Sequence, residues 1–201
     1  MDEARGFRIG RRGFLLGAAV MTGVAAAPPG AGAGKEAGQS AGKLAWDFSF
    51  PSIDGGTLDL SRFRGRVLLV VNTASFCGYT YQYRALEALQ REISPRGLTV
   101  VGVPSQDFHQ ESGSNAEVKH FCKATFDVRF PMAGISHVTG QDAAPFYRWV
   151  KETRGWAPDW NFCKVLIGRD GTILGTYRSA EEPQGATIAA AIDAALAQPA
   201  V

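Results

Sequence analysis

The sequence lacks the patterns in which cysteine and histidine most often bind metals or exchange disulfides. Its three cysteines, Cys77, Cys122 and Cys163, form neither a CxxC pair nor the spacing of a zinc site, and its three histidines are scattered. The missing second cysteine argues against a dithiol–disulfide exchanger. We therefore expect no metal site and no bound cofactor. In an oxidising compartment, an odd number of cysteines leaves at least one thiol free or catalytic.

The chain also lacks a marked excess of charge. Its formal net charge is +2 at pH 7. This excess comes from charged residues near the N-terminus, namely Arg5, Arg8, Arg11 and Arg12 against Asp2 and Glu3. Because basic and acidic side chains balance in the remainder, we expect neither a nucleic-acid partner nor a stable membrane anchor.

The N-terminal apolar run is too short to span a membrane. It extends over residues 14–27, about 14 residues, whereas a spanning helix needs about 20. Arg11-Arg12 directly before it resembles a twin-arginine export signal. We expect residues 1–33 to be a signal peptide, which makes the protein periplasmic or otherwise exported. A retained signal anchor is the alternative.

The remaining chain fits a single domain. Residues 34–45 are rich in Gly and Ala and are expected to form a flexible linker, and residues 46–201 are expected to form the folded domain. That length is sufficient for one core without disulfide bonds.

Hydrophobic periodicity predicts alternating strands and helices. The continuous apolar run Val67–Val71 is typical of a central strand that is buried on both faces. Further strands are expected at 98–103 and in hairpins over 48–60 and 162–177. Helices are expected at 81–93, at 115–122 after the N-cap Ser114, at 145–153 and at 186–197. This order predicts an α/β fold with parallel strands joined by crossovers and a terminal hairpin.

Cys77 lies between the first buried strand and the helix expected over 81–93. Backbone N–H groups and the helix dipole at such a position favour an anion, and the thiolate is the form that attacks a peroxide oxygen. Gly78 permits a tight turn, and Thr80 is a candidate helix cap. From the residues alone, an inert buried thiol competes equally with this interpretation.

Several linked segments stand out along the chain, namely Asn72–Ser75 before Cys77–Tyr83, then Gly102–Ser105, Gln110-Glu111, Phe130–Met132, and Trp160–Phe162 with Lys164. Together they resemble the glutathione peroxidase family in its cysteine-containing bacterial form. The resemblance covers about residues 46–197. It implies a thioredoxin-like fold with a central mixed sheet flanked by helices and an N-terminal β-hairpin. It also implies reduction of hydrogen peroxide and organic or lipid hydroperoxides through a cysteine sulfenic acid, with glutathione or a thioredoxin-type thiol as reductant.

The resemblance implies that Cys77 is the nucleophile and that Trp160 and Asn161 are neutral donors beside it. The family's glutamine does not carry over, because Asp107 stands at its position and Gln106 precedes it. An anionic Asp107 beside Cys77 would disfavour the thiolate. Either Asp107 turns away or is neutral, or Gln106 takes the donor role.

A sulfenic acid on Cys77 must be reduced by a thiol, and two cysteines could resolve it internally. Cys163 lies two residues after Asn161, on the same face if this segment is a strand. Cys122 lies one position from the family's resolving cysteine and lacks that residue's neighbours. For both, a buried inert thiol is the favoured alternative.

Only ten residues separate Trp149 from Trp160. This resembles family members without the subunit-contact loop, which implies a monomer with an open active site. The competing functions are an exported thioredoxin-like thiol–disulfide oxidoreductase and a non-catalytic binding module of the same fold.

Overall fold

The computed structural model describes residues 42–199. The expected signal peptide and residues 34–41 of the expected linker lie outside the described residues. In chain order the elements are η1 (Ala45–Asp47), β1 (Ser49–Pro51), β2 (Thr57–Asp59), η2 (Leu60–Phe63), β3 (Val67–Thr73), α1 (Gln82–Ile93), η3 (Ser94–Arg96), β4 (Leu98–Pro104), α2 (Asn115–Phe126), α3 (Pro145–Arg154), β5 (Lys164–Ile167), β6 (Ile173–Tyr177) and α4 (Ala186–Leu196).

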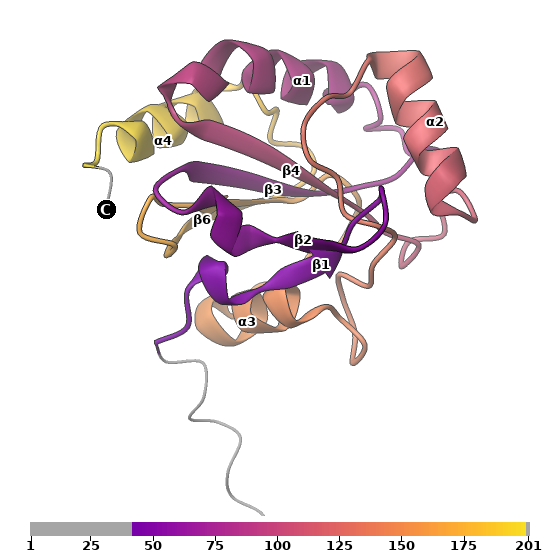
Figure 1. The fold of residues 1–201 in the computed structure, drawn as a ribbon, viewed down its shortest axis with the longest axis horizontal. Coiled ribbons are helices and arrows are strands. Elements are labelled where there is room, and N and C mark those ends of the chain that lie inside the picture. The colour runs from indigo at the N-terminus through magenta and orange to yellow at the C-terminus, as the bar shows by residue number, and fades with distance from the viewer. Residues whose placement is uncertain (1–41, 200–201) are drawn as a thin grey trace, which may run out of the picture. The chain divides into compact units, whose positions relative to one another are not determined.

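A four-stranded mixed sheet forms the centre of the fold (Figure 1). Its strand order is β4-β3-β5-β6, with β3 and β4 parallel and β5 antiparallel to both β3 and β6. Every residue of β3 and β4 is buried, as the continuous apolar runs predict. The strands β1 and β2 pair separately as the expected N-terminal hairpin. The predicted α/β class and mixed sheet are therefore confirmed.

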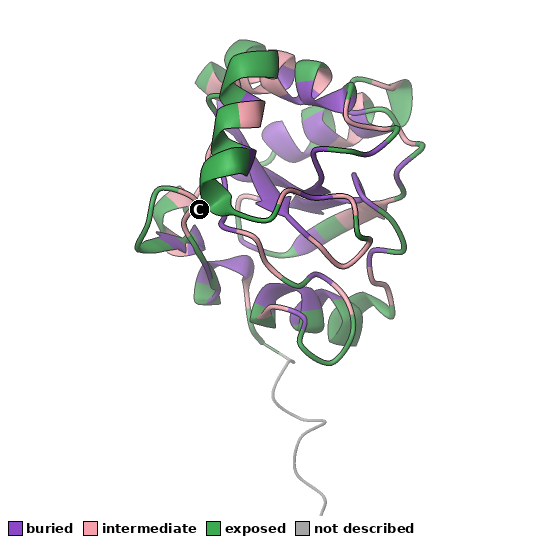
Figure 2. Ribbon diagram, turned by 90° about the vertical axis from the view of Figure 1, so that its right-hand side faces the viewer, coloured by how far each residue is buried: buried purple, intermediate pink, exposed green. Residues whose placement is uncertain are grey.

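The two faces of the sheet are covered by different elements, because successive strand residues point to opposite sides. On one face, α1, α2 and α4 pack on Val67, Leu69 and Val71. On the other face, α3 and the β1–β2 hairpin pack on Leu68 and Val70. Figure 2 shows the buried residues concentrated in the strands and on the inner sides of the helices.

Local hydrogen bonds mark where the folded domain begins and where α2 starts. Ala45, expected as the last linker residue, is buried, and its N–H donates to the Gly171 carbonyl at 2.9 Å. The Ser114 hydroxyl caps α2 by accepting the Glu117 N–H. The Glu117 carboxylate bonds to that hydroxyl at 3.0 Å. A full capping box would instead place it on the Ser114 N–H.

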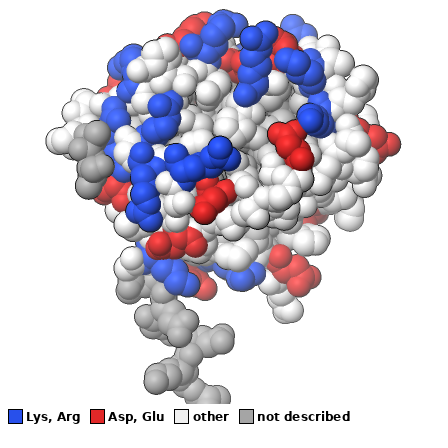
Figure 3. Space-filling view, in the orientation of Figure 1, with Lys and Arg blue, Asp and Glu red and all other residues white. Residues whose placement is uncertain are grey.

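Charged side chains of both signs are interspersed on the face shown in Figure 3. Several form exposed ion pairs, such as Lys119–Asp54 and Lys123–Asp127. Such pairs contribute little to stability. None of the helices in residues 42–199 is long and apolar enough to cross a membrane.

Candidate active site

Cys77 lies in a tight turn between β3 and α1. The Thr80 hydroxyl accepts the Cys77 N–H at 3.1 Å and donates to the Cys77 carbonyl at 2.6 Å. Thr80 therefore closes the turn around the cysteine. Our expectation that it caps the helix is wrong, because α1 begins at Gln82 and the residue at its N-cap is Tyr81.

The Cys77 sulfur receives a backbone hydrogen bond from within this turn. The Tyr79 N–H donates to Cys77 Sγ at 3.4 Å, and Cys77 is 8% exposed. The helix dipole acts mainly within the first turn, and α1 begins five residues after Cys77. The turn amide is therefore the donor that the structure places on the sulfur, in a site largely shielded from water.

The Trp160-Asn161 segment is held against the end of β3 by Asn72. The Asn72 amide donates to the Trp160 carbonyl at 2.9 Å, and its side-chain oxygen accepts the Cys163 N–H at 3.0 Å. The Phe162 N–H donates to the Asn72 carbonyl at 2.6 Å. These bonds fix the segment to the strand that ends four residues before Cys77. Asn161 is fully buried, whereas Trp160 is partly exposed.

Asp107 faces the loop of residues 137–139. Its carboxylate accepts the Val138 and Thr139 N–H groups at 2.6 and 3.0 Å and lies 2.6 Å from His137 Nδ1. Burial acts to raise the pKa of Asp107, but the hydrogen bonds from His137 and the two amides outweigh it and hold that pKa below its ordinary value. Of the alternatives, the structure shows an ionised Asp107 that is turned to another loop.

Gln106 is also occupied away from the cysteine. Its amide nitrogen donates to the Glu111 carbonyl at 2.5 Å, and its oxygen accepts the Glu111 N–H at 3.2 Å. This side chain closes the loop that carries it. The geometry gives no support to Gln106 as the donor beside Cys77.

Gln110 and Glu111 join this loop to the Cys77 turn, a role that the sequence did not reveal. The Gln110 carbonyl accepts the Phe76 N–H at 2.9 Å, and the Glu111 carboxylate accepts the Ser75 N–H at 3.0 Å. Burial raises the pKa of Glu111. The Gln110 side-chain oxygen accepts a hydrogen bond from the Asn161 amide at 2.9 Å. The only signal for these residues was their match to the family pattern.

Comparisons with known proteins identify the family. A family model described as glutathione peroxidase matches residues 45–151. Glutathione peroxidase 7 of Bos taurus is 42% identical over 134 residues, which cover 66% of this chain and 72% of that protein. A hydroperoxy fatty acid reductase of Synechocystis is 38% identical over 149 residues, covering 69% of this chain and 88% of that protein.

The chain belongs to the glutathione peroxidase family. As predicted from the sequence, it is a thiol-dependent peroxidase.

Solved structures agree with this assignment. The apo form of Trgpx superposes with a TM-score of 0.64 at 35% identity, covering 79% of this chain and 99% of that one. A thiol:disulfide interchange protein from Chlorobium tepidum superposes with a TM-score of 0.57 at 18% identity, covering 74% of this chain and 92% of that one. The second likeness shows the fold alone. The predicted thioredoxin-like fold is therefore confirmed.

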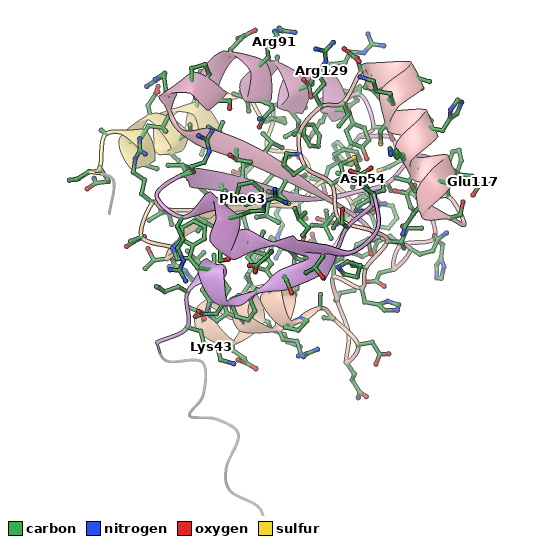
Figure 4. All side chains as sticks on the ribbon, in the orientation of Figure 1. Lys43, Asp54, Phe63, Arg91, Glu117 and Arg129 are labelled. Carbon is green, nitrogen blue, oxygen red and sulfur yellow. The ribbon has the colours of Figure 1, made fainter. Side chains whose placement is uncertain are left out.

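The two other cysteines of this glutathione peroxidase are buried thiols without a disulfide. Burial raises the pKa of Cys122 to about 11, so this thiol stays protonated at neutral pH. Cys122 borders a hollow of about 390 Å³ that is also lined by Asp54, Phe63 and Arg129. Figure 4 labels these last three residues. Cys163 Sγ lies 3.5 Å from an Asp159 carboxylate oxygen.

Lys164, which follows Cys163, is also buried. Its ammonium donates to the carbonyls of Ser179 and Glu181, and burial lowers its pKa to about 8. It ties β5 to the segment after β6.

Within residues 42–199, no three His, Cys, Asp or Glu side chains gather as a metal site.

Proposed function

We propose that this glutathione peroxidase reduces hydrogen peroxide and organic hydroperoxides at Cys77, outside the cytoplasm, with an external thiol as reductant. The observation that carries the proposal is the position of the Cys77 sulfur. The sulfur is held in a closed turn and accepts the Tyr79 N–H. This turn follows the end of β3, to which the Trp160-Asn161 segment is bonded through Asn72.

The reaction begins with attack of the Cys77 thiolate on one peroxide oxygen. The S–O bond forms as the O–O bond breaks, and sulfur loses two electrons. The leaving oxygen takes a proton and departs as an alcohol, or as water when the substrate is hydrogen peroxide. Trp160 and Asn161 are the side-chain donors proposed to orient the peroxide and to stabilise the charge on the leaving oxygen.

A reductant thiol then attacks the sulfenic sulfur, which releases water and leaves a mixed disulfide. A second thiol breaks this disulfide and returns Cys77 as a thiol. We favour an external thiol, either glutathione or a thioredoxin-type protein, because both Cys122 and Cys163 are buried. Peptide mapping under non-reducing conditions after one equivalent of peroxide tests this step. A Cys77 disulfide to Cys122 or Cys163 would establish internal resolution instead.

Exposed aromatic side chains support organic and lipid hydroperoxides as substrates. Phe76 and Tyr81 flank the cysteine turn and are 67% and 52% exposed, and Trp160 is 41% exposed. Apolar surface of this kind suits an acyl chain better than it suits water. A relative named hydroperoxy fatty acid reductase points in the same direction.

Export and oligomeric state complete the proposal. Residues 1–33 are proposed to direct export by the twin-arginine route. The test is a variant in which both Arg11 and Arg12 are replaced by lysine. Loss of the protein from the periplasmic fraction in this variant would support the proposal. The short connection between Trp149 and Trp160 favours a monomer. Light scattering after size exclusion tests this, and a stable tetramer would contradict it.

A coupled NADPH assay tests the central claim. Wild type and Cys77→Ser are compared with glutathione plus glutathione reductase and with thioredoxin plus thioredoxin reductase. We expect hydroperoxide-dependent NADPH oxidation in wild type and none above background in the variant. Equal, negligible rates would support a binding module, and insulin reduction without peroxide turnover would support a thiol–disulfide oxidoreductase.

A further inference from the structure

The replacement of the family's glutamine leaves this active site short of one carboxamide. Asp107 occupies that position, and its carboxylate is bound by His137, Val138 and Thr139. An ionised carboxylate cannot donate a hydrogen bond. The residue at the expected position therefore cannot perform the glutamine's task.

The neighbouring glutamine is unsuited for a different reason. Both polar atoms of the Gln106 side chain face the main chain of Glu111. Moving this side chain to Cys77 would leave the Glu111 N–H and carbonyl without these partners. Losing a partner for a buried polar group costs about 1–3 kcal/mol.

Gln110 has the contacts that the other two residues lack. Its main-chain carbonyl accepts the N–H of Phe76, the residue before the nucleophile, at 2.9 Å. Its side-chain oxygen accepts the Asn161 amide at 2.9 Å. One residue thus touches the cysteine turn with its backbone and the buried Asn161 with its side chain.

The bond to Gln110 fixes the orientation of the Asn161 carboxamide. Asn161 is fully buried, and its oxygen has no hydrogen-bond partner among residues 42–199. Without the acceptor at Gln110, the carboxamide could rotate by a half-turn and exchange its nitrogen and oxygen. While Gln110 accepts through its side-chain oxygen, the Asn161 nitrogen is held as a donor.

We propose that Gln110 is a positioning residue of this site, which acts by orienting the Asn161 carboxamide. The inference rests on the proposed role of Cys77 and Asn161 in peroxide reduction. It assigns to Gln110 a function that Asp107 and Gln106 do not have.

The test is a double-mutant cycle on the rate constant of Cys77 oxidation by hydrogen peroxide. Sulfenic acid is trapped with dimedone at timed intervals and quantified by mass spectrometry, so the reductant plays no part. Gln110→Met is made in wild type and in Asn161→Ala. Gln90→Met is the matched control, since the half-buried Gln90 also accepts one hydrogen bond, from the Val100 N–H on the far end of β4.

We expect Gln110→Met to lower this rate constant about tenfold, as loss of one well-formed hydrogen bond does, and to have no further effect in Asn161→Ala. Gln90→Met should keep the wild-type rate constant. A wild-type rate constant in Gln110→Met would overturn the inference. So would an equal loss in both backgrounds, or an Asn161→Ala variant that is as fast as wild type.

Two further variants separate the possible failures. If Gln110→Met does not fold, Gln110→Asn withdraws the oxygen from Asn161 by one methylene and takes its place in the cycle. If Cys77→Ser still consumes peroxide, the proposed nucleophile is wrong. An inactive Cys77→Ser beside a fully active Gln110→Met would refute only the inference about Gln110.

Discussion

Two segments flank the Cys77 turn, and they are held in different ways. Residues 160–163 are bonded to Asn72 at the buried end of β3, by its main chain and its side chain. Residues 105–111 reach the turn through Ser75 and Phe76, but the side chain of Asp107 is bound to the loop of residues 137–139.

The family pattern is kept at Trp160–Phe162 in the first segment, and in the second it is kept at Gln110-Glu111 but broken at Asp107. From this contrast we infer that a site residue is hard to replace where its backbone is bonded to a buried strand. A side chain held by another loop can be exchanged together with its partners, provided that the backbone contacts to the turn remain.

The largest effect should come from residues 160–163, the segment that keeps the Trp-Asn pair of the family. Asn161→Ala removes a neutral donor from a shielded site and should lower peroxide turnover about a hundredfold. Asp107→Asn should lower it less than about threefold, because its carboxylate points away from the cysteine. Steady-state peroxidase assays compare the two. Similar losses in both variants would erase the distinction between the segments.

Asn72→Ala tests what holds residues 160–163 in place. It removes two side-chain hydrogen bonds and leaves the Trp160 carbonyl and the Cys163 N–H unpaired, so the free energy of unfolding should fall by about 2–4 kcal/mol. Urea denaturation measures this. Asn115→Ala is the matched control, because its one bond to the Ile135 N–H is exposed. An equal loss in the control would contradict the special role of Asn72.

Glu111→Gln tests the contact of the second segment with the turn. Burial raises the folded-state pKa of Glu111 above 4.5, so between 4.5 and that higher pKa the folded state binds more protons than the unfolded state. Wild type should therefore lose stability as pH rises through this window. The neutral variant keeps the acceptor for Ser75 and should not show this loss. Urea unfolding from pH 4 to 8 measures both, and parallel profiles would refute the prediction.

The smallest effect should come from the exposed partner of Asp107. The hydrogen bond to Asp107 raises the pKa of His137 above 6.5. The stabilisation that this hydrogen bond contributes is therefore fully present below pH 6.5 and is lost as pH rises through the folded-state pKa of His137. His137→Gln should lower Tm at pH 5.5, match wild type at pH 9 and leave activity unchanged. A Tm difference that is constant with pH would contradict this.

The sequence predicted the elements well, because they follow from local patterns. Apolar runs located β3 and β4. The linked motifs point to Cys77, Trp160 and Asn161 as site residues, and that assignment stays a prediction. The partners of Asp107 could not be predicted, since Val138 lies 31 positions away in a loop without periodicity. Thr80 was misassigned because the same hydroxyl suits a helix cap and a turn. Gln110 was missed because its contact with Asn161 depends on how two distant segments meet.

The attachment of residues 160–163 to β3 also determines how the active site comes apart. The amide hydrogens of Phe162 and Cys163 are bonded to Asn72, so their exchange with solvent requires the central sheet to open. The amides of Val138 and Thr139 can exchange when one loop lifts from Asp107. On heating, the Trp160-Asn161 part of the proposed site should therefore persist until global unfolding, and loss of activity should coincide with the melting of the whole domain.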